Sequence, residues 1–206
     1  LGFSLIFGIF GIDNLNAFLI VNAVMVAITM WSVVKLSQYL NLTSRGQRIV
    51  AILVMLDIPL ITSSGYIYSN SAGLCLAVLA ALVGVKSFTQ KNALGIIILM
   101  SCSFLLLALS MLVKGTEILF ALAMTLIFVL SGLHKKSYWI SALAVILFMI
   151  AHSLSSISLP LVESITGEHF GTSLPQLSWI AIGLSQQPDQ TAPGWWTNSA
   201  INIYSI

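Results

Sequence analysis

The placement of its few charged residues constrains this chain more than any other feature of its sequence. Lys and Arg number 8, and Asp and Glu number 6, in 206 residues. Long apolar runs separate the charges, which occur in short clusters: Asp13; Lys35, Arg45 and Arg48; Asp57; Lys86 and Lys91; Lys114 and Glu117; Lys135 and Lys136; Glu163, Glu168 and Asp189. Because 58% of the residues are hydrophobic, a soluble domain of this size cannot bury them all, and the solvent around these runs is lipid.

The apolar runs have the length of membrane-spanning helices. About 20 apolar residues cross a bilayer as an α-helix. The candidate spans are residues 15–36, 49–68, 71–86, 93–113, 117–134 and 138–159. The third and fifth are short, so we expect them to extend into flanking residues or to tilt differently. The sequence therefore predicts an all-α polytopic membrane protein, with about six transmembrane helices forming a bundle over residues 1–159.

Residues 160–206 differ in kind from the rest of the chain. They contain four of the 5 prolines and three of the 5 tryptophans. The segment SLPQLSWIAIGLS (173–185) predicts a short helix on the membrane surface, and QPDQTAPGWWTNSA (187–200) has the composition of a loop. Since the chain begins at Leu1 and has no signal-peptide pattern, we interpret it as an internal piece of a longer protein whose tail region continues.

The charge clusters also predict an orientation. If Asp13 is outside, seven of the 8 basic residues fall in cytoplasmic gaps, and only Lys114 falls outside. We therefore expect a multi-pass protein of the plasma membrane with cytoplasmic basic loops and residues 160–206 on the exoplasmic side. The basic residues form no stripe, so nucleic acid is not an expected partner, whereas the lipid bilayer is.

Lys114 is the first candidate binding residue. It lies in the tight connection LVKGTE, beside Glu117. A lone cation at the outer mouth of a helix bundle suits a phosphate or pyrophosphate, and the N-terminus of the following helix also favours an anion. The alternative is a lysine that reaches the membrane surface and pairs with Glu117.

Asp57 and His152 are candidate polar residues within the membrane. A carboxylate in a span is costly and is therefore a functional candidate, and Asp57 precedes Pro59, where we expect a kink. The alternative for Asp57 is a protonated or hydrogen-bonded side chain that fixes packing at the kink. His152 is a candidate ligand or proton relay, and the alternative is a histidine satisfied by packing near serines that form a hydrogen-bonding face.

Metal chemistry has little support in the sequence. His169 beside Glu168 is a weak metal signal, and His134 beside Lys135 is expected at the membrane interface. Cys75 and Cys102 lie in apolar runs, where small buried core residues are the main expectation and a disulfide or metal pair is the alternative. No metal site is predicted.

The tail carries a resemblance. SWIAIGLSQQPDQTAPGWWTNSAINIYS (178–205) resembles a motif of bacterial multispanning glycosyltransferases of the GT-C superfamily, related to the protein mannosyltransferases of family 39. Its first part, W-x-x-M-G-L, is matched by Trp179, Gly183 and Leu184, with Ile182 where Met is usual. Its second part, roughly G-W/Y-x-N, corresponds to Gly194, Trp195 and Asn198, with two residues between Trp195 and Asn198 where the motif has one.

The resemblance implies a membrane glycosyltransferase. Such an enzyme transfers a sugar from a polyprenyl-phosphate donor to a glycan, lipid or protein acceptor at the outer face of the membrane. Its catalytic acid would precede Leu1, Lys114 would bind the donor phosphate, and the tail motif would contact substrate. No cofactor is firmly implied, although a divalent metal ion fits this chemistry.

Two other classes remain open. A multispanning transporter or lipid-carrier flippase would use Asp57 and His152 as coupling residues near the membrane midplane. A membrane scaffold without enzymatic activity is the third. A long aromatic outer tail favours the transferase, which needs an exoplasmic acceptor site.

Overall fold

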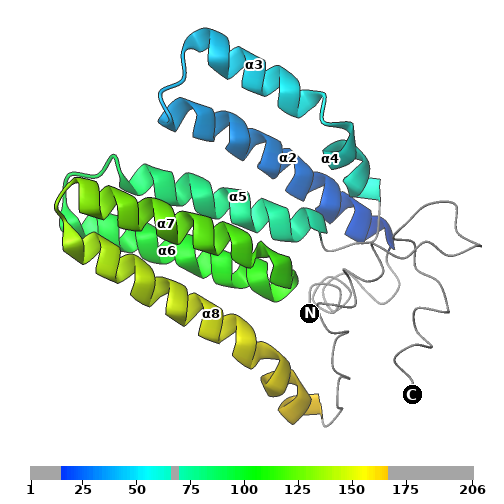
Figure 1. The fold of residues 1–206 in the computed structure, drawn as a ribbon. Coiled ribbons are helices and arrows are strands. Elements are labelled where there is room, and N and C mark those ends of the chain that lie inside the picture. Colours follow the sequence, from blue (N-terminus) through cyan, green and yellow to red (C-terminus); the bar gives the residue numbers. More distant parts are fainter. Residues whose placement is uncertain (1–14, 66–69, 167–206) are drawn as a thin grey trace, which may run out of the picture. The chain divides into compact units, whose positions relative to one another are not determined.

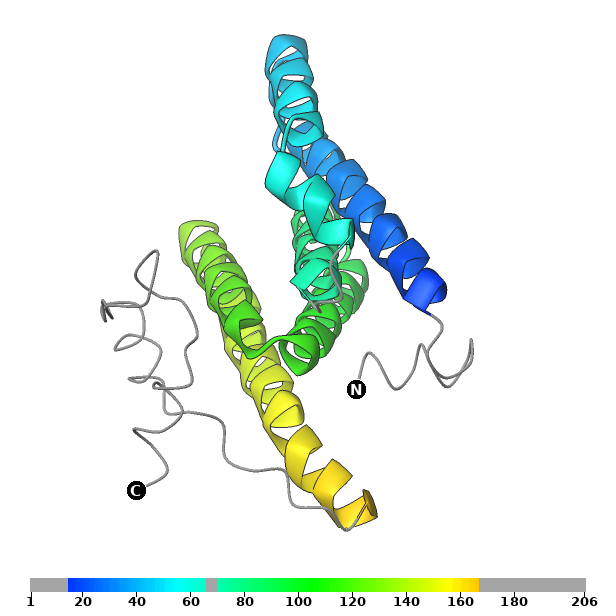
Figure 2. The same cartoon turned by 90° about the vertical axis from the view of Figure 1, so that its right-hand side faces the viewer.

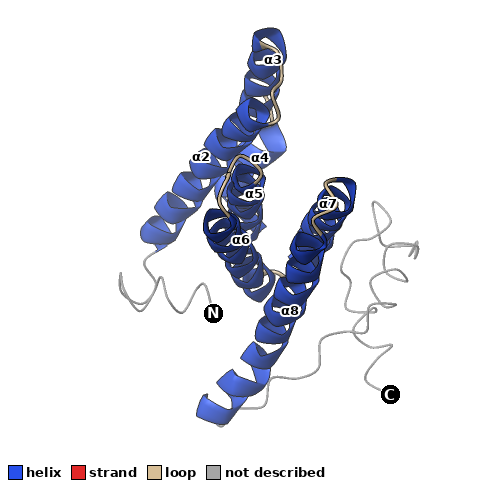
Figure 3. Cartoon of the chain, turned by 90° about the vertical axis from the view of Figure 1, so that its left-hand side faces the viewer, coloured by secondary structure: helices blue, strands red, loops and turns tan. Residues whose placement is uncertain are grey.

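A computed structural model describes residues 15–65 and 70–166 (Figure 1). The chain divides into two units, residues 1–161 and 162–206, and the account below concerns the first unit together with the end of the helix that leads out of it. The helices are α2 (Leu15–Tyr39), α3 (Ser44–Met55), α4 (Ile58–Thr62), α5 (Asn70–Ser87), α6 (Ala93–Val113), α7 (Ile118–His134) and α8 (Tyr138–Thr166), with 3-10 turns η1 (Ser63–Gly65) and η2 (Gly115–Glu117). The described residues contain no strand (Figure 3), so the all-α prediction is confirmed for them.

Four helices are long and apolar enough to cross a membrane. They are Leu15–Tyr39, Ala93–Val113, Gly115–His134 and Tyr138–Ile157. The bent pair of α3 and α4 adds a fifth span only if the two helices count as one. The apolar helix Ser71–Ser87 is shorter than the four spanning helices. The multispanning character is thus supported, whereas the predicted number of about six spans is not confirmed.

The second predicted span, 49–68, is not one continuous helix. α3 ends at Met55, α4 begins at Ile58, and the two segments are bent by 46° at the break. The kink expected near Pro59 is therefore present, and the helix is completely interrupted there. A proline near a helix start fits there without loss, because its missing N–H would have no partner within the helix.

α8 is longer than the predicted span 138–159. It passes through Pro160 and ends at Thr166. The helix therefore continues past the predicted end of the span at residue 159, although the apolar part that can cross a membrane is Tyr138–Ile157 and the chain divides into its two units after Leu161. A proline inside a helix removes one backbone hydrogen bond but does not oblige the chain to leave the helix.

α5 is the central helix of the described bundle. It contacts α2 and α6 along most of its length, and it also contacts α7, while α3 packs on α2. Ala77 and Ala80 of α5 are fully buried, as small residues that let helices approach closely. The largest fully buried side chains, Phe104, Phe128, Met100 and Leu107, come from α6 and α7.

Side chains at the ends of the helices bring several basic residues to one end of this bundle. Lys35 at the end of α2 and Lys86 at the end of α5 line the same cleft. The Lys135 ammonium lies 5.6 Å from the centre of the Phe88 ring, beyond the end of α5. Lys114 packs instead beside Gly73, near the start of α5. The structure thus places Lys35, Lys86 and Lys135 near one end of the bundle, and Lys114 near the opposite end of α5.

Candidate functional site

α6 and α7 are joined by a short connection (Figure 2). This connection contains Lys114. α6 ends at Val113, and Lys114 is extended, with φ −150° and ψ 112°. Its backbone N–H donates to the carbonyl of Ser110 at 2.9 Å, and its carbonyl accepts from the N–H of Glu117 at 3.0 Å. Because the backbone is fixed on both sides, the half-buried Lys114 side chain starts from a rigid turn.

Gly73 forms the wall against which this turn packs. A Cβ at Gly73 would lie 3.3 Å from Lys114 Cβ, 3.5 Å from Glu117 Cγ and 3.6 Å from Glu117 Oε1. The Ser110 hydroxyl donates to the Gly73 carbonyl at 2.7 Å. The absence of a side chain at Gly73 therefore lets α5 lie directly against both charged residues.

Glu117 is the buried charge of this cluster. Its side chain is 6% exposed, and Oε2 has no hydrogen-bond partner among the described residues. Lys114 is the neighbouring cation whose charge acts on this carboxyl group. A buried carboxyl oxygen without a partner calls for a specific explanation, such as a proton or a ligand hydroxyl. Among the described residues, the structure shows no ion pair between the Lys114 ammonium and this carboxyl group, so the pairing given as the alternative for Lys114 is not formed.

A second polar contact lies near the same end of α5. The Ser71 hydroxyl donates to Asn22 Oδ1 at 2.7 Å, and both residues are buried. Asn22, Ser71, Gly73 and Ser110 were not predicted as site residues. Their signal in the sequence is that small or polar residues stand in otherwise apolar runs, where they mark helix contacts.

Together, these residues form a polar end to the bundle, which we call the Lys114 cluster: Asn22, Ser71, Gly73, Ser110, Lys114 and Glu117. It contains an ammonium group, which attracts anions, and a buried carboxyl oxygen that has no partner among the described residues. An ammonium is a point charge that phosphate oxygens accept well, and a carboxylate accepts from a sugar or water.

Asp57 has a structural position. It is the N-cap of α4, where its Oδ1 accepts from the N–H of Leu60 at 3.1 Å, and its side chain is exposed. A capping carboxylate satisfies a free N–H at a helix start. This geometry agrees with the alternative reading of Asp57, a hydrogen-bonded side chain at the kink.

His152 lies on an exposed face of α8. Its ring stacks on Phe148, with centroids 6.1 Å apart and planes within 6°. Its carbonyl accepts from the hydroxyls of Ser155 at 2.8 Å and Ser156 at 2.9 Å, so the expected hydrogen-bonding serines bond within their own helix. Serine hydroxyls commonly bond in this way to carbonyls one turn earlier.

The remaining predicted residues divide into two groups. Trp179, Gly183, Gly194, Trp195 and Asn198 of the tail motif lie outside the described residues, as do Asp13 and His169. Within the described ranges, no group of three or more His, Cys, Asp or Glu residues could hold a metal. Both cysteines are free; Cys75 is buried as expected, but Cys102 is exposed, because its position faces outward from α6.

No protein-family model, no curated protein and no solved structure matches this chain. The likeness of residues 178–205 to the GT-C motif therefore rests on the motif residues themselves. Any functional conclusion has to come from the chemistry of the Lys114 cluster and from that motif.

Proposed function

We propose that this chain belongs to a membrane glycosyltransferase that uses a polyprenyl-phosphate-linked sugar donor at the exoplasmic face. About six spans, the broken pair α3–α4 and the short α5 included, would form its membrane part. The motif over residues 178–205 supplies the enzyme class, and the Lys114 cluster supplies a place for the donor phosphate. The acceptor would be a glycan, a lipid or a protein.

The position of Lys114 is the observation that carries the proposal. It is the basic residue set apart from the basic end of the bundle, and it starts from a turn that is hydrogen-bonded on both sides. When the sugar leaves its carrier, charge grows on the lipid phosphate. A fixed ammonium nearby stabilises that charge more in the transition state than in the bound substrate, and this difference accelerates the transfer.

Glu117 would act beside Lys114. Its unpartnered Oε2 is buried, so it would accept a hydrogen bond from a donor sugar hydroxyl only after the surrounding side chains move aside. A different carboxylate is expected to remove the acceptor proton in this class of enzyme, so Glu117 is assigned a binding role. The lipid tail of the donor would stay in the hydrocarbon while its phosphate reaches this end of the bundle.

The transporter alternative is less well supported by the geometry. It needs polar residues that face a substrate path within the bundle. Asp57 is exposed and caps α4, and His152 is exposed and stacks within α8. Each side chain therefore has a local role that needs no transported substrate.

The direct test is sugar transfer by the complete protein in membranes, with labelled polyprenyl-phosphate hexoses as donors. We expect Lys114→Ala to lower kcat/KM for the donor about 10- to 100-fold, the loss typical of a charge-assisted contact of about 1.5–3 kcal/mol. Lys114→Arg should retain part of the activity, since it keeps the charge with a different shape. Lys91→Ala, at the other end of the bundle, is the matched control and should be silent.

A second variant tests the packing of the cluster without removing a charge. Gly73→Val places carbon atoms against Lys114 and Glu117, and we expect it to raise the KM for the donor in a protein that still folds. Unchanged turnover of Lys114→Ala at limiting donor would remove Lys114 from the site. If none of the hexose donors is turned over by the unmodified protein, the transferase class is wrong.

A further inference from the structure

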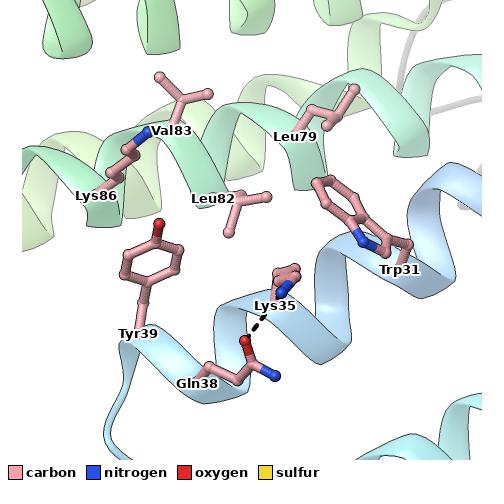
Figure 4. A pocket seen from close by; sticks show the side chains of 8 residues that line it. All are labelled: Trp31, Lys35, Gln38, Tyr39, Leu79, Leu82, Val83 and Lys86. Atoms are coloured by element: carbon pink, nitrogen blue, oxygen red, sulfur yellow. Dashed lines mark hydrogen bonds between the residues drawn. The ribbon is translucent and has the colours of Figure 1, made fainter.

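A cleft lies between α2 and α5 at the basic end of the bundle (Figure 4). Its volume is about 480 Å³, within the range of small-ligand sites. α2 and α5 each contribute four side chains; the lining residues are Trp31, Lys35, Gln38, Tyr39, Leu79, Leu82, Val83 and Lys86. The cleft is remote from the Lys114 cluster along α5, so it is a separate feature.

Helix periodicity explains why these side chains converge. On α2, positions 31, 35, 38 and 39 recur at intervals of about one and two turns, and positions 79, 82, 83 and 86 do the same on α5. Figure 4 shows Trp31 and Tyr39 rising from α2 toward α5, with Leu82 and Lys86 opposite them. The cleft is therefore a property of two packed helices and does not depend on a loop.

The chemistry of the lining changes along the cleft. Leu79, Leu82 and Val83 form an apolar wall on α5. Lys35 and Lys86 come from opposite helices, and the lining contains no acidic residue. Lys35 is half-buried, and its Nζ donates to Gln38 Oε1 at 3.2 Å, so its charge is not neutralised by that contact.

The aromatic residues indicate the depth of the cleft in the bilayer. Trp31 is 54% exposed although it lies on a helix long enough to span, and Tyr39 is the last residue of that helix. Trp and Tyr favour the level of the lipid head groups, where their rings are apolar on one side and polar on the other. We therefore expect Lys35 and Lys86 to lie at the level of the lipid phosphate groups.

From these features we propose that the cleft between α2 and α5 binds one anionic phospholipid. Lys35 and Lys86 hold its phosphate from two sides, the Tyr39 hydroxyl and the Gln38 amide face its polar head, and an acyl chain runs along the leucines of α5. Basic pockets between membrane helices bind anionic head groups by this combination of charge and apolar wall.

Charge complementarity selects this occupant. A zwitterionic lipid would bring a cationic head group next to two lysines, with no acidic partner in the lining. A soluble phosphate would satisfy the lysines but leave the apolar wall without a partner. The proposal does not depend on the glycosyltransferase assignment, because it concerns other residues at the other end of α5.

Lipid retention by the complete protein tests the proposal. The protein is purified in mild detergent and titrated with phosphatidylglycerol or phosphatidylcholine, and native mass spectrometry measures the fraction that carries one lipid. We expect selective binding of phosphatidylglycerol. Lys35→Gln and Lys86→Gln should each weaken it about fivefold, as expected for a lysine near an anionic lipid, and the double variant more than either.

Three controls decide the outcome. Lys91→Gln removes the same charge from an exposed position outside the cleft, and an equal loss there would mean general surface attraction and overturn the site. Displacement of phosphatidylglycerol by excess inorganic phosphate would identify a soluble anion and overturn the lipid assignment. The double variant Lys35→Arg with Lys86→Arg keeps both charges and should bind phosphatidylglycerol about as well as the unmodified protein. Loss of that binding in a folded double variant would also contradict the proposal that the two lysines hold the phosphate.

Discussion

The Ser71 hydroxyl donates a hydrogen bond of 2.7 Å to Asn22 Oδ1, across 49 positions of the chain. Both side chains are buried, and the bond joins α5 to α2 within the Lys114 cluster, two positions before Gly73 on α5. Between membrane helices, lipid offers no hydrophobic driving force for association. Such polar contacts and close packing at small residues therefore decide which helices pair.

The Asn22–Ser71 bond should appear as an energetic coupling. Asn22→Ala and Ser71→Ala each remove the bond, so the double variant should cost less than the sum of the two single variants. Polar pairs between membrane helices average about 0.6 kcal/mol and reach about 1.7 kcal/mol. Thermal unfolding of the four proteins in detergent measures the difference, and strict additivity would show that the pair is not coupled.

Gly84 should tolerate no larger residue. A Cβ there would meet the Met124 methyl group, and it would lie 2.9 Å from Ser103 Oγ, which itself donates to the Ala80 carbonyl at 2.8 Å. We expect Gly84→Val to lower stability by about 1–3 kcal/mol, as overpacking does.

Gly65 provides the matched control for Gly84. A Cβ at Gly65 has no heavy atom of the described residues within 4 Å, so Gly65→Val should leave the melting temperature nearly unchanged. Equal melting temperatures for the Val variants of both glycines would contradict the packing described between α5, α6 and α7.

Asp57 should behave as a helix cap. Asp57→Ala removes the acceptor for the Leu60 N–H and should cost about 1 kcal/mol, whereas Asn keeps an oxygen in place and should cost little. Urea or thermal unfolding compares the three proteins. A well-folded Asp57→Asn protein that loses all sugar transfer would instead give the carboxylate a chemical role.

The proposed orientation predicts opposite labelling at the two ends of the bundle. Thr116 and Lys91 are both exposed and lie in loops at the two ends of α6. In intact cells, a membrane-impermeant maleimide should label Thr116→Cys directly and Lys91→Cys only after permeabilisation. The reverse pattern, or labelling of both from one side, would contradict the orientation taken from the basic clusters.

Helix positions could be predicted from the sequence because the helices end at polar residues, which are visible in the local sequence. α6 covers the predicted residues 93–113, and Asn92 caps it by accepting from the N–H of Gly95 at 3.2 Å. Lys114 ends the same helix. The break in the second span was predicted only as a kink. Asp57 acts as the N-cap of α4 because of its backbone conformation, and the surrounding apolar sequence does not indicate that conformation.

The candidate site was predicted only in part. Lys114 was identified because it departs from the charge alternation, but Gly73 and Ser110 carried no comparable signal. In a membrane helix, apolar residues face both lipid and neighbouring helices, so hydrophobic periodicity does not reveal the packed face. The contact of Gly73 with Lys114 and Glu117 joins different helices and follows from their packing.

The sequence by itself determined that the chain is helical, apolar enough for lipid, and divided by alternating charge clusters, because these properties follow from composition and local order. Tertiary structure decided which clusters meet. It placed Lys35 and Lys86 in the lining of one cleft, and it placed Lys114 against Gly73. These pairs depend on the close approach of helices at small residues, and that approach is a property of the packed bundle.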